Sequence, residues 1–313
     1  MNCLICVEDS PLAASVEAAV QSYTEAHRCA PPELTKVDPT DAVVIIDDKA
    51  LGAVPHAPSH FTIGITSGSV ADGVELMARH PWLQQLGTPA LFESDGLKWL
   101  LYRLTRQVPE LDNDTLTFLG QERLHARRVL FYKSRDIESR LARLEEFASS
   151  VGARSRAIEQ LHDITNELLV NAFYDAPYEA GLFREPPARQ QPIEMPPDMP
   201  CELVYGATES ELFVRVRDCF GALTRQRLLD VLLRCARGAN VELDESRGGV
   251  GLGMWRIFRQ SSRVIISVEP GASTEMLVTV PKSGVQRKNL RAWHFLFDDV
   301  QAGGGPARTS RAR

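Results

Sequence analysis

The sequence predicts a mixed α/β protein with two structured regions. Up to about residue 105, short apolar runs alternate with helical patterns, which is typical of a parallel sheet with crossover helices. Further along, ELVYGATESELFVRVRD and RVIISVEPGASTEMLVTVP each place two alternating runs around a polar turn, which indicates antiparallel hairpins. The length of 313 residues suits two domains of ordinary size.

Composition narrows the class of protein. A hydrophobic content of 44% and a charged content of 24% are those of a soluble globular protein. The net charge of −6 argues against nucleic acid or an anionic membrane as partner, and no apolar run is long enough to cross a bilayer. We therefore expect a cytoplasmic protein with neither partner.

Six cysteines are scattered along the chain, and only Cys3 and Cys6 have a CxxC spacing. This spacing fits a buried first strand better than a zinc or redox motif. We expect reduced cysteines in a reducing compartment.

In residues 1–105 the expected strands are CLICV, AVVIID, FTIGIT and PALF, separated by helical patterns such as VADGVELMARH. This order predicts a parallel α/β domain. Residues 106–151 are expected to be a helical linker, because from about Leu119 the sequence is charged and heptad-like. It would be one long amphipathic helix, or two with a break, that joins the domains or carries a partner or dimer surface.

The elements predicted for residues 152–290 follow the order helix, proline-rich loop, hairpin, helix, glycine-rich loop, helix, hairpin. Helices on one face of an antiparallel or mixed sheet would give an α/β sandwich. Residues 177–200 hold seven prolines, so we expect a surface insertion without regular structure, which either covers a site or binds something. We expect residues 291–313 to be a largely disordered tail, since AGGGPARTSRAR has no large apolar side chain.

The first motif is the helical pattern ITNELLVNAFYDA at residues 164–176. Glu167, Asn171 and Asp175 are spaced by four and share one face of a helix that Pro177 should end. Asparagine is disfavoured inside helices, so this polar stripe indicates either a site or a solvated outer face.

Two further motifs come later in the chain. VRVRDCFGAL predicts a strand that ends at Asp218, followed by a turn containing Phe220 and Gly221. RGGVGLGMWRIF is a glycine-rich segment before a helix, and the free N–H groups of a helix N-terminus favour phosphate. Its central residues are Gly249, Gly251, Leu252 and Gly253.

In this order, over residues 155–282, the three motifs resemble the N, G1 and G2 boxes of the GHKL ATPases, a family that includes gyrase, heat-shock chaperone ATPases, histidine kinases and MutL. The greatest similarity is to the anti-sigma-factor serine kinases. The resemblance implies that Asn171 holds Mg²⁺, Glu167 is the base, Asp218 binds the adenine amine and Thr274, or Ser273, lies near the ring. The ATP-binding set it implies is Asn171, Asp175, Asp218, Gly221, Gly249, Gly251, Leu252, Gly253 and Thr274. The sequence departs from the Asp-x-Gly-x-Gly pattern of the G1 box, because Phe220 replaces the first glycine.

The resemblance leaves several activities open. A serine/threonine kinase-like protein would phosphorylate a partner signalling protein, or use ATP to switch its binding. A histidine kinase would need a phosphoacceptor such as His162 or His125, but His162 lies on the N-box helix itself. A non-catalytic scaffold, a monomer or a homodimer all fit the sequence.

The opening LICVEDSPLAASVEAAV resembles the first strand and helix of response-regulator receivers. Glu8 and Asp9 stand at the position of the receiver's Mg²⁺-binding acidic pair, Asp47 at the phosphorylated aspartate, and Thr66 or Ser67 at the hydroxyl. No lysine comes after PALF, where receivers keep one. The resemblance therefore implies a degenerate receiver used for docking, with a phosphorelay through Asp47 as the alternative.

Overall fold

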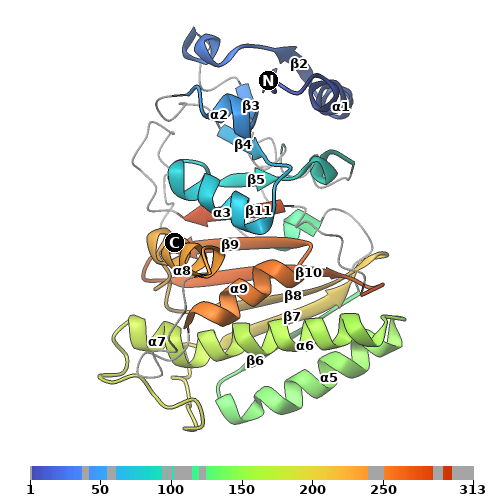
Figure 1. Ribbon diagram of the computed structural model, residues 1–313. Helices are drawn as coiled ribbons and strands as arrows, with labels where there is room; N and C mark the ends of the chain where they lie inside the picture. The colour runs from blue at the N-terminus through green and yellow to red at the C-terminus, as the bar shows by residue number, and fades with distance from the viewer. Residues whose placement is uncertain are drawn as a thin grey trace.

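The chain is a mixed α/β protein, as the sequence predicts. The computed structural model describes residues 2–36, 42–54, 61–93, 97, 101, 115–119, 125–238, 250–284 and 292–297. Within these ranges eleven strands form one continuous sheet, in the order β2-β1-β3-β4-β5-β11-β9-β10-β8-β7-β6. Figure 1 shows the sheet running from the N-terminal strands at the top to β6 at the bottom.

The N-terminal half forms a parallel sheet, as expected. Its strands are β1 (Asn2–Cys6), β2 (Glu25–Arg28), β3 (Ala42–Asp47), β4 (Phe61–Ile65) and β5 (Gln85–Gly87). Its helices are α1 (Ser10–Gln21), η1 (Pro31–Lys36), α2 (Asp48–Leu51), α3 (Val70–Arg79) and η2 (Pro89–Glu93). The expected fourth strand, PALF, is the 3-10 helix η2 instead, and the strand lies just before it. Pro89 has no N–H to donate to a sheet, which disfavours strand pairing there.

The C-terminal half is antiparallel from β6 to β9. Its strands are β6 (His125–Phe131), β7 (Cys201–Ala207), β8 (Glu211–Asp218), β9 (Arg263–Glu269) and β10 (Ser273–Pro281). Its helical segments are η3 (Thr115–Leu119), η4 (Ser134–Asp136), α5 (Ile137–Ser150), α6 (Ser155–Val170), the π-helix η5 (Asn171–Asp175), α7 (Ala176–Glu179), α8 (Arg225–Ala236) and α9 (Val250–Gln260). Helices α5, α6 and α9 lie in front of the sheet in Figure 1, where α6 contacts β8 and β10.

The expected linker helix is wrong for its first part. Residues 125–131 form β6, which pairs antiparallel with β7 from His125 opposite Ala207 to Phe131 opposite Cys201. Helix α5 begins only at Ile137. Because β6 is an edge strand, most of its side chains are exposed, and HARRVLF lacks the strict alternation that marks a half-buried strand.

The expected disordered tail is also wrong for its first residues. Residues 292–297 form β11 (Ala292–Phe297), whose side chains are all buried. This strand pairs antiparallel with β5 and parallel with β9, so it joins the two halves into one sheet. The segment AGGGPARTSRAR lies outside the described residues.

Buried apolar side chains of the described residues form two clusters, one on each face of the sheet. Successive side chains of β8 point into alternate clusters, since Val214 faces α6 and Phe213 faces η3. Each large side chain fully buried in such a cluster contributes roughly 1.5–3 kcal/mol. Residues from both halves occur in both clusters, so the halves share their core.

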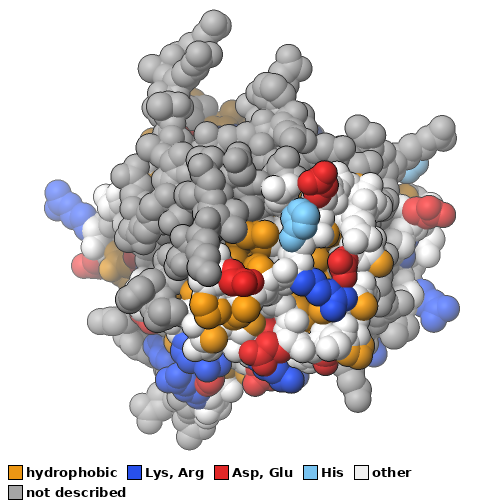
Figure 2. Space-filling view, turned by 90° about the horizontal axis from the view of Figure 1, so that it is seen from above, with side chains coloured by type: hydrophobic (Ala, Val, Ile, Leu, Met, Phe, Trp, Pro, Cys, Tyr) orange, Lys and Arg blue, Asp and Glu red, His pale blue; other side chains and the backbone are white. Residues whose placement is uncertain are grey.

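Both outer edges of the sheet carry charged side chains. Strand β2 exposes Glu25, His27 and Arg28, and β6 exposes Arg127 and Arg128. Figure 2 looks down on the β2 end, where acidic and basic groups lie among apolar ones. Charged edges disfavour pairing with another chain.

None of the helices in the described residues has the length and apolarity needed to span a bilayer.

Candidate functional site

A pocket opens in the C-terminal half, between the sheet and the helices that cover one of its faces. Its polar lining comes from four parts of the fold: the continuation of α6, the end of β8, the first turn of α8 and the start of β10. The polar residues are Asn171, Asp175, Glu179, Asp218, Arg227 and Thr274. The pocket encloses about 580 Å³ of empty space, which includes solvent at its mouth.

The remaining wall is apolar. Leu168 and Ala172 face the pocket from the helix, Val216 and Met276 from the sheet, and Met254 from α9. Flexible methionine side chains adapt to flat or irregular ligands. A flat, weakly polar group would therefore be well accommodated between the sheet and the helices.

Asn171 and Asp175 lie on a π-helical turn that the sequence did not predict. Helix α6 runs to Val170, continues as η5 and then as α7 to Glu179, so Pro177 does not end it. Proline cannot donate an N–H to a helix, and the turn just before it is wider than an α-helical turn, since the Ala176 N–H bonds to the Asn171 carbonyl five residues earlier. Single π turns of this kind often occur at functional sites.

Asp218 ends β8, directly opposite Thr274 on β10. Its Oδ1 accepts hydrogen bonds from the backbone N–H groups of Phe220, at 2.9 Å, and Gly221, at 3.4 Å. Burial raises the pKa of the Asp218 carboxyl to about 6, although these N–H groups and the backbone N–H and side-chain hydroxyl of Thr274 act in the opposite direction. The carboxylate is thus buried and predominantly ionised at neutral pH.

Glycine is required at position 221. The residue has a φ of +59°, and a Cβ there would collide with the carbonyl oxygen of Glu269. Phe220, which replaces a glycine of the family pattern, is buried in the core and does not line the pocket. The departure from the pattern therefore leaves the pocket open.

Two ion pairs stand at the rim of the pocket. Arg189 Nη2 lies 2.9 Å from Asp175 Oδ2, and Arg227 pairs with Glu179. Burial raises the pKa of Asp175, while Arg189 and Arg227 lower it. Arg189 belongs to the proline-rich insertion, so this insertion contacts Asp175, a residue of the pocket lining.

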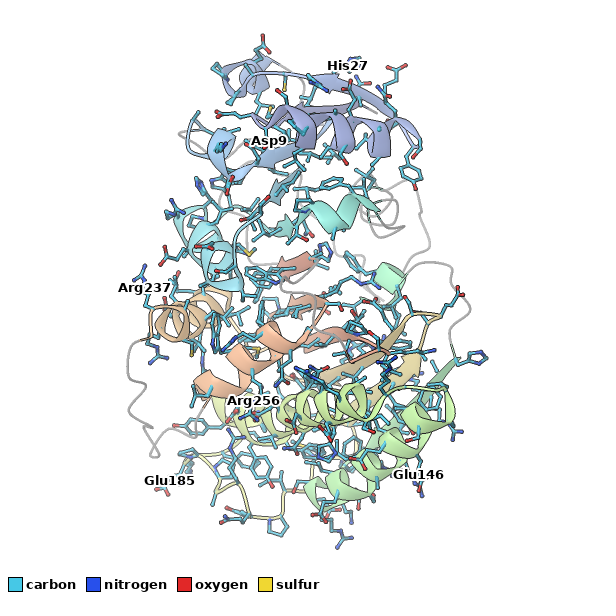
Figure 3. All side chains as sticks on the ribbon, turned by 45° about the vertical axis from the view of Figure 1, so that its right-hand side comes forward. Asp9, His27, Glu146, Glu185, Arg237 and Arg256 are labelled. Carbon is cyan, nitrogen blue, oxygen red and sulfur yellow. The ribbon has the colours of Figure 1, made fainter. Side chains whose placement is uncertain are left out.

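Glu167 lies one turn before Asn171 but does not line the pocket. Its Oε1 is 3.9 Å from Nη1 of Arg256, which Figure 3 shows on α9 above α6. The carboxylate packs against Gly253, where any Cβ would collide with it. Glu167 therefore depends on the absence of a side chain at Gly253.

The predicted glycine loop is partly helical. Helix α9 begins at Val250, so Gly251, Leu252 and Gly253 lie in its first turn instead of in a loop. Leu252 is exposed and Gly253 is buried. Gly249 lies outside the described residues.

The receiver-like residues serve as structural caps. Asp47 Oδ1 accepts from the Ala50 N–H at 2.8 Å, and Oδ2 accepts from Glu8 N–H at 2.9 Å and Asp9 N–H at 3.4 Å. Asp9 caps α1 through the Leu12 N–H. The Thr66 hydroxyl accepts from the Gly68 N–H at 3.1 Å. Within the described ranges, no cluster of three or more His, Cys, Asp or Glu side chains is arranged to hold a metal ion.

The two histidines considered as phosphoacceptors lie apart from the pocket. His162 Nδ1 is 2.7 Å from Glu145 Oε1, so it joins α6 to α5. His125 lies on the edge strand β6, and the linker helix expected to carry it is absent at that position.

Sequence reasoning missed Glu179, Arg227 and Arg189. Glu179 extends the predicted polar stripe by four residues beyond Asp175, so the spacing signals it once the helix continues past Pro177. No pattern in the sequence signals Arg189 or Arg227, because their positions depend on how the insertion and α8 pack.

Models of known protein families give no match to this sequence, and curated proteins give no significant match.

Proposed function

We propose that this protein binds Mg²⁺-ATP in the pocket between α6, β8, β10 and α9, and uses it to phosphorylate or switch a partner signalling protein. The observation that carries the proposal is the convergence of Asn171, Asp218 and Thr274 on one pocket. They come from separate segments, and the resemblance to GHKL ATPases assigns each a place around ATP.

The adenine end would lie at Asp218. A buried, ionised carboxylate beside an apolar wall suits a flat ring that presents an amino group. A base with a carbonyl at that position would leave the carboxylate without a donor, at a cost of about 1–3 kcal/mol. The site therefore favours adenine over guanine, with Thr274 beside the ring.

The phosphate end would lie toward Asn171. The amide oxygen of Asn171 and the carboxylate of Asp175 are the hard oxygen donors that Mg²⁺ accepts. When bound, Mg²⁺ neutralises phosphate charge. The first turn of α9 supplies backbone N–H groups without intrahelical partners, which favour anions.

The reaction proposed is phosphoryl transfer to a serine or threonine of the partner, as the similarity to anti-sigma-factor serine kinases implies. Glu167 would accept the proton of the attacking hydroxyl, because it lies one helical turn from Asn171. Arg256 Nη1 lies 3.9 Å from the Glu167 Oε1 that would take this proton.

The fold of each half of the chain supports this proposal. The antiparallel half with helices on one face supports a GHKL sandwich for residues 152–290. The parallel order β2-β1-β3-β4-β5 is that of flavodoxin-like and receiver folds, which supports a receiver-like region for residues 1–105. With Asp47 used as a cap, this region would dock a partner instead of carrying phosphate.

A non-catalytic scaffold is the second candidate. It is favoured by Glu167, which lies outside the pocket lining and opposite Arg256. In such a scaffold ATP would bind without being turned over.

Nucleotide titrations with and without Mg²⁺, together with transfer of labelled γ-phosphate to candidate partners, test the proposal. We expect Asn171→Ala to lose the Mg²⁺ dependence of ATP binding. Asn166→Ala, on the same helix but outside the pocket, is the matched control. We expect Glu167→Ala to keep binding and lose turnover. Equal Mg²⁺ dependence in both asparagine variants would contradict the metal assignment, and full turnover by Glu167→Ala would exclude it as the base.

A further inference from the structure

The CxxC spacing at the start of the chain does not make a cysteine pair. Cys3 and Cys6 are three residues apart on β1, so they face opposite sides of the sheet and belong to different core clusters. The neighbour of Cys6 is instead Cys29, which comes directly after β2. The Sγ atoms of Cys6 and Cys29 lie 2.9 Å apart, and both thiols are free.

The backbone holds these two cysteines side by side. Strands β1 and β2 pair in parallel up to Ile5 opposite Arg28, and the Cys29 N–H bonds to the Ile5 carbonyl at 3.1 Å. Neighbouring strands lie about 4.8 Å apart. That spacing falls within the Cα separations of about 4.4–6.8 Å that a disulfide spans.

The two thiols differ in environment. Cys6 is buried and Cys29 is partly exposed, so a small oxidant reaches Cys29 first. The hydrogen bond with Cys6 lowers the pKa of Cys29, which favours its thiolate, while the same bond and burial raise the pKa of Cys6. This asymmetry is that of an attacking and a resolving thiol.

We propose that Cys6 and Cys29 form a redox-active pair that closes to a reversible disulfide when a hydroperoxide oxidises the protein. The Cys29 thiolate attacks the terminal oxygen of the hydroperoxide, the O–O bond breaks, and Cys29 becomes a sulfenic acid. The other oxygen leaves as alkoxide or hydroxide and takes a proton from water. The Cys6 thiol then attacks the sulfenic sulfur, the S–S bond forms, and the hydroxyl leaves as water with the Cys6 proton. Two thiols are oxidised and the hydroperoxide is reduced. A small dithiol then reduces the disulfide by thiol–disulfide exchange and is itself oxidised.

The disulfide would tie the edge strand β2 to β1 immediately before the loop at Glu8 and Asp9, whose N–H groups bond to Asp47. Closing this loop of the chain restricts the unfolded state, so we expect the Tm to rise by roughly 5 °C. Formation of this disulfide does not depend on nucleotide binding.

The test treats the whole protein with hydrogen peroxide, then alkylates free thiols and maps tryptic peptides. Cleavage after Arg28 separates the cysteines, so the expected product is residues 1–28 linked to residues 29–36, absent after dithiothreitol. Cys3→Ser, the matched control in the same peptide, should give the same link. In Cys6→Ser we expect Cys29 to be trapped as a sulfenic acid by dimedone.

Two results would overturn the proposal. One is an unlinked wild-type protein at a peroxide dose that oxidises the partly exposed Cys235. The other is a link that survives in Cys6→Ser and is lost in Cys3→Ser. Fragmentation of the linked wild-type peptide places the bond at Cys6 or at Cys3, which lie in the same tryptic peptide, so misfolding of a variant would not obscure the answer.

Discussion

Asp47 and Asp218 are both buried carboxylates at the end of a strand, but they differ in their hydrogen-bond partners and in what lies beside them. Hydrogen bonds from three backbone N–H groups occupy both oxygens of Asp47. Two backbone N–H groups of the next turn bind Oδ1 of Asp218, and this residue also lines a pocket. The next segment makes the difference. Helix α2 begins directly after Asp47, whereas a glycine turn leads the chain away from Asp218. A strand-end aspartate thus either caps the next helix or lines a pocket, according to the segment that comes after it.

The glycine turn after Asp218 is the feature that distinguishes it from Asp47, and its loss should have the largest effect. Gly221→Ala forces a Cβ against the Glu269 carbonyl at a φ of +59°, so we expect a loss of stability on the order of 4 kcal/mol. Gly152→Ala is the control, since its φ is +78° with nothing within 4 Å, and should cost about 1 kcal/mol. Urea unfolding measures both. Equal losses would mean that the contact at Gly221 is unimportant.

Replacing Asp218 itself should stabilise the ligand-free protein. Its folded pKa of about 6 lies above the ordinary value of 3.8, so the folded state binds more protons between these values. The contribution of this group to stability is therefore greatest below pH 4 and falls as pH rises through 6. At pH 8 we expect Asp218→Asn to gain up to about 3 kcal/mol, since each pKa unit is worth about 1.4 kcal/mol. Unfolding curves at pH 5 and pH 8 test this, and a destabilised variant at pH 8 would refute it.

Replacing Asp47 should have the opposite effect. Asp47→Ala leaves three backbone donors without their acceptor, and we expect a loss of about 2 kcal/mol with ATP affinity unchanged. Asp9→Ala, an exposed cap of α1, should lose about 1 kcal/mol. Thermal unfolding and nucleotide titration separate the two effects. A loss of ATP affinity in Asp47→Ala would show that the N-terminal half contributes to the site.

The smallest effect on stability is expected at Gly253. Alanine favours a helix by about 1 kcal/mol, and displacing the Glu167 carboxylate offsets that gain. We expect Gly253→Ala to change stability by less than about 1 kcal/mol while turnover falls, because the proposed base moves. Activity assays beside unfolding curves test this. Unchanged turnover would separate Glu167 from the chemistry.

The sequence anticipated side chains whose place depends on local pattern. Periodicity placed Asn171 and Asp175 on one helix face, and the strand pattern ended β8 at Asp218, whereas Thr274, at the start of β10, came from the family resemblance; all four line the pocket. It missed elements that depend on distant contacts. The tail predicted from residue 291 contains strand β11, although AWHFLF is an apolar run, and β6 is defined by its pairing with β7. Arg189 reaches Asp175 only because the insertion folds back on the helix.

Calorimetric titration with Mg²⁺-ATP tests the central claim most directly. We expect micromolar ATP binding by the wild type and by the control Asp230→Asn, which changes an exposed residue of α8. GTP should bind poorly, and Asp218→Asn should lose roughly 10- to 100-fold in ATP affinity. No ATP binding to folded protein, or equal affinity in Asp218→Asn, would contradict the account.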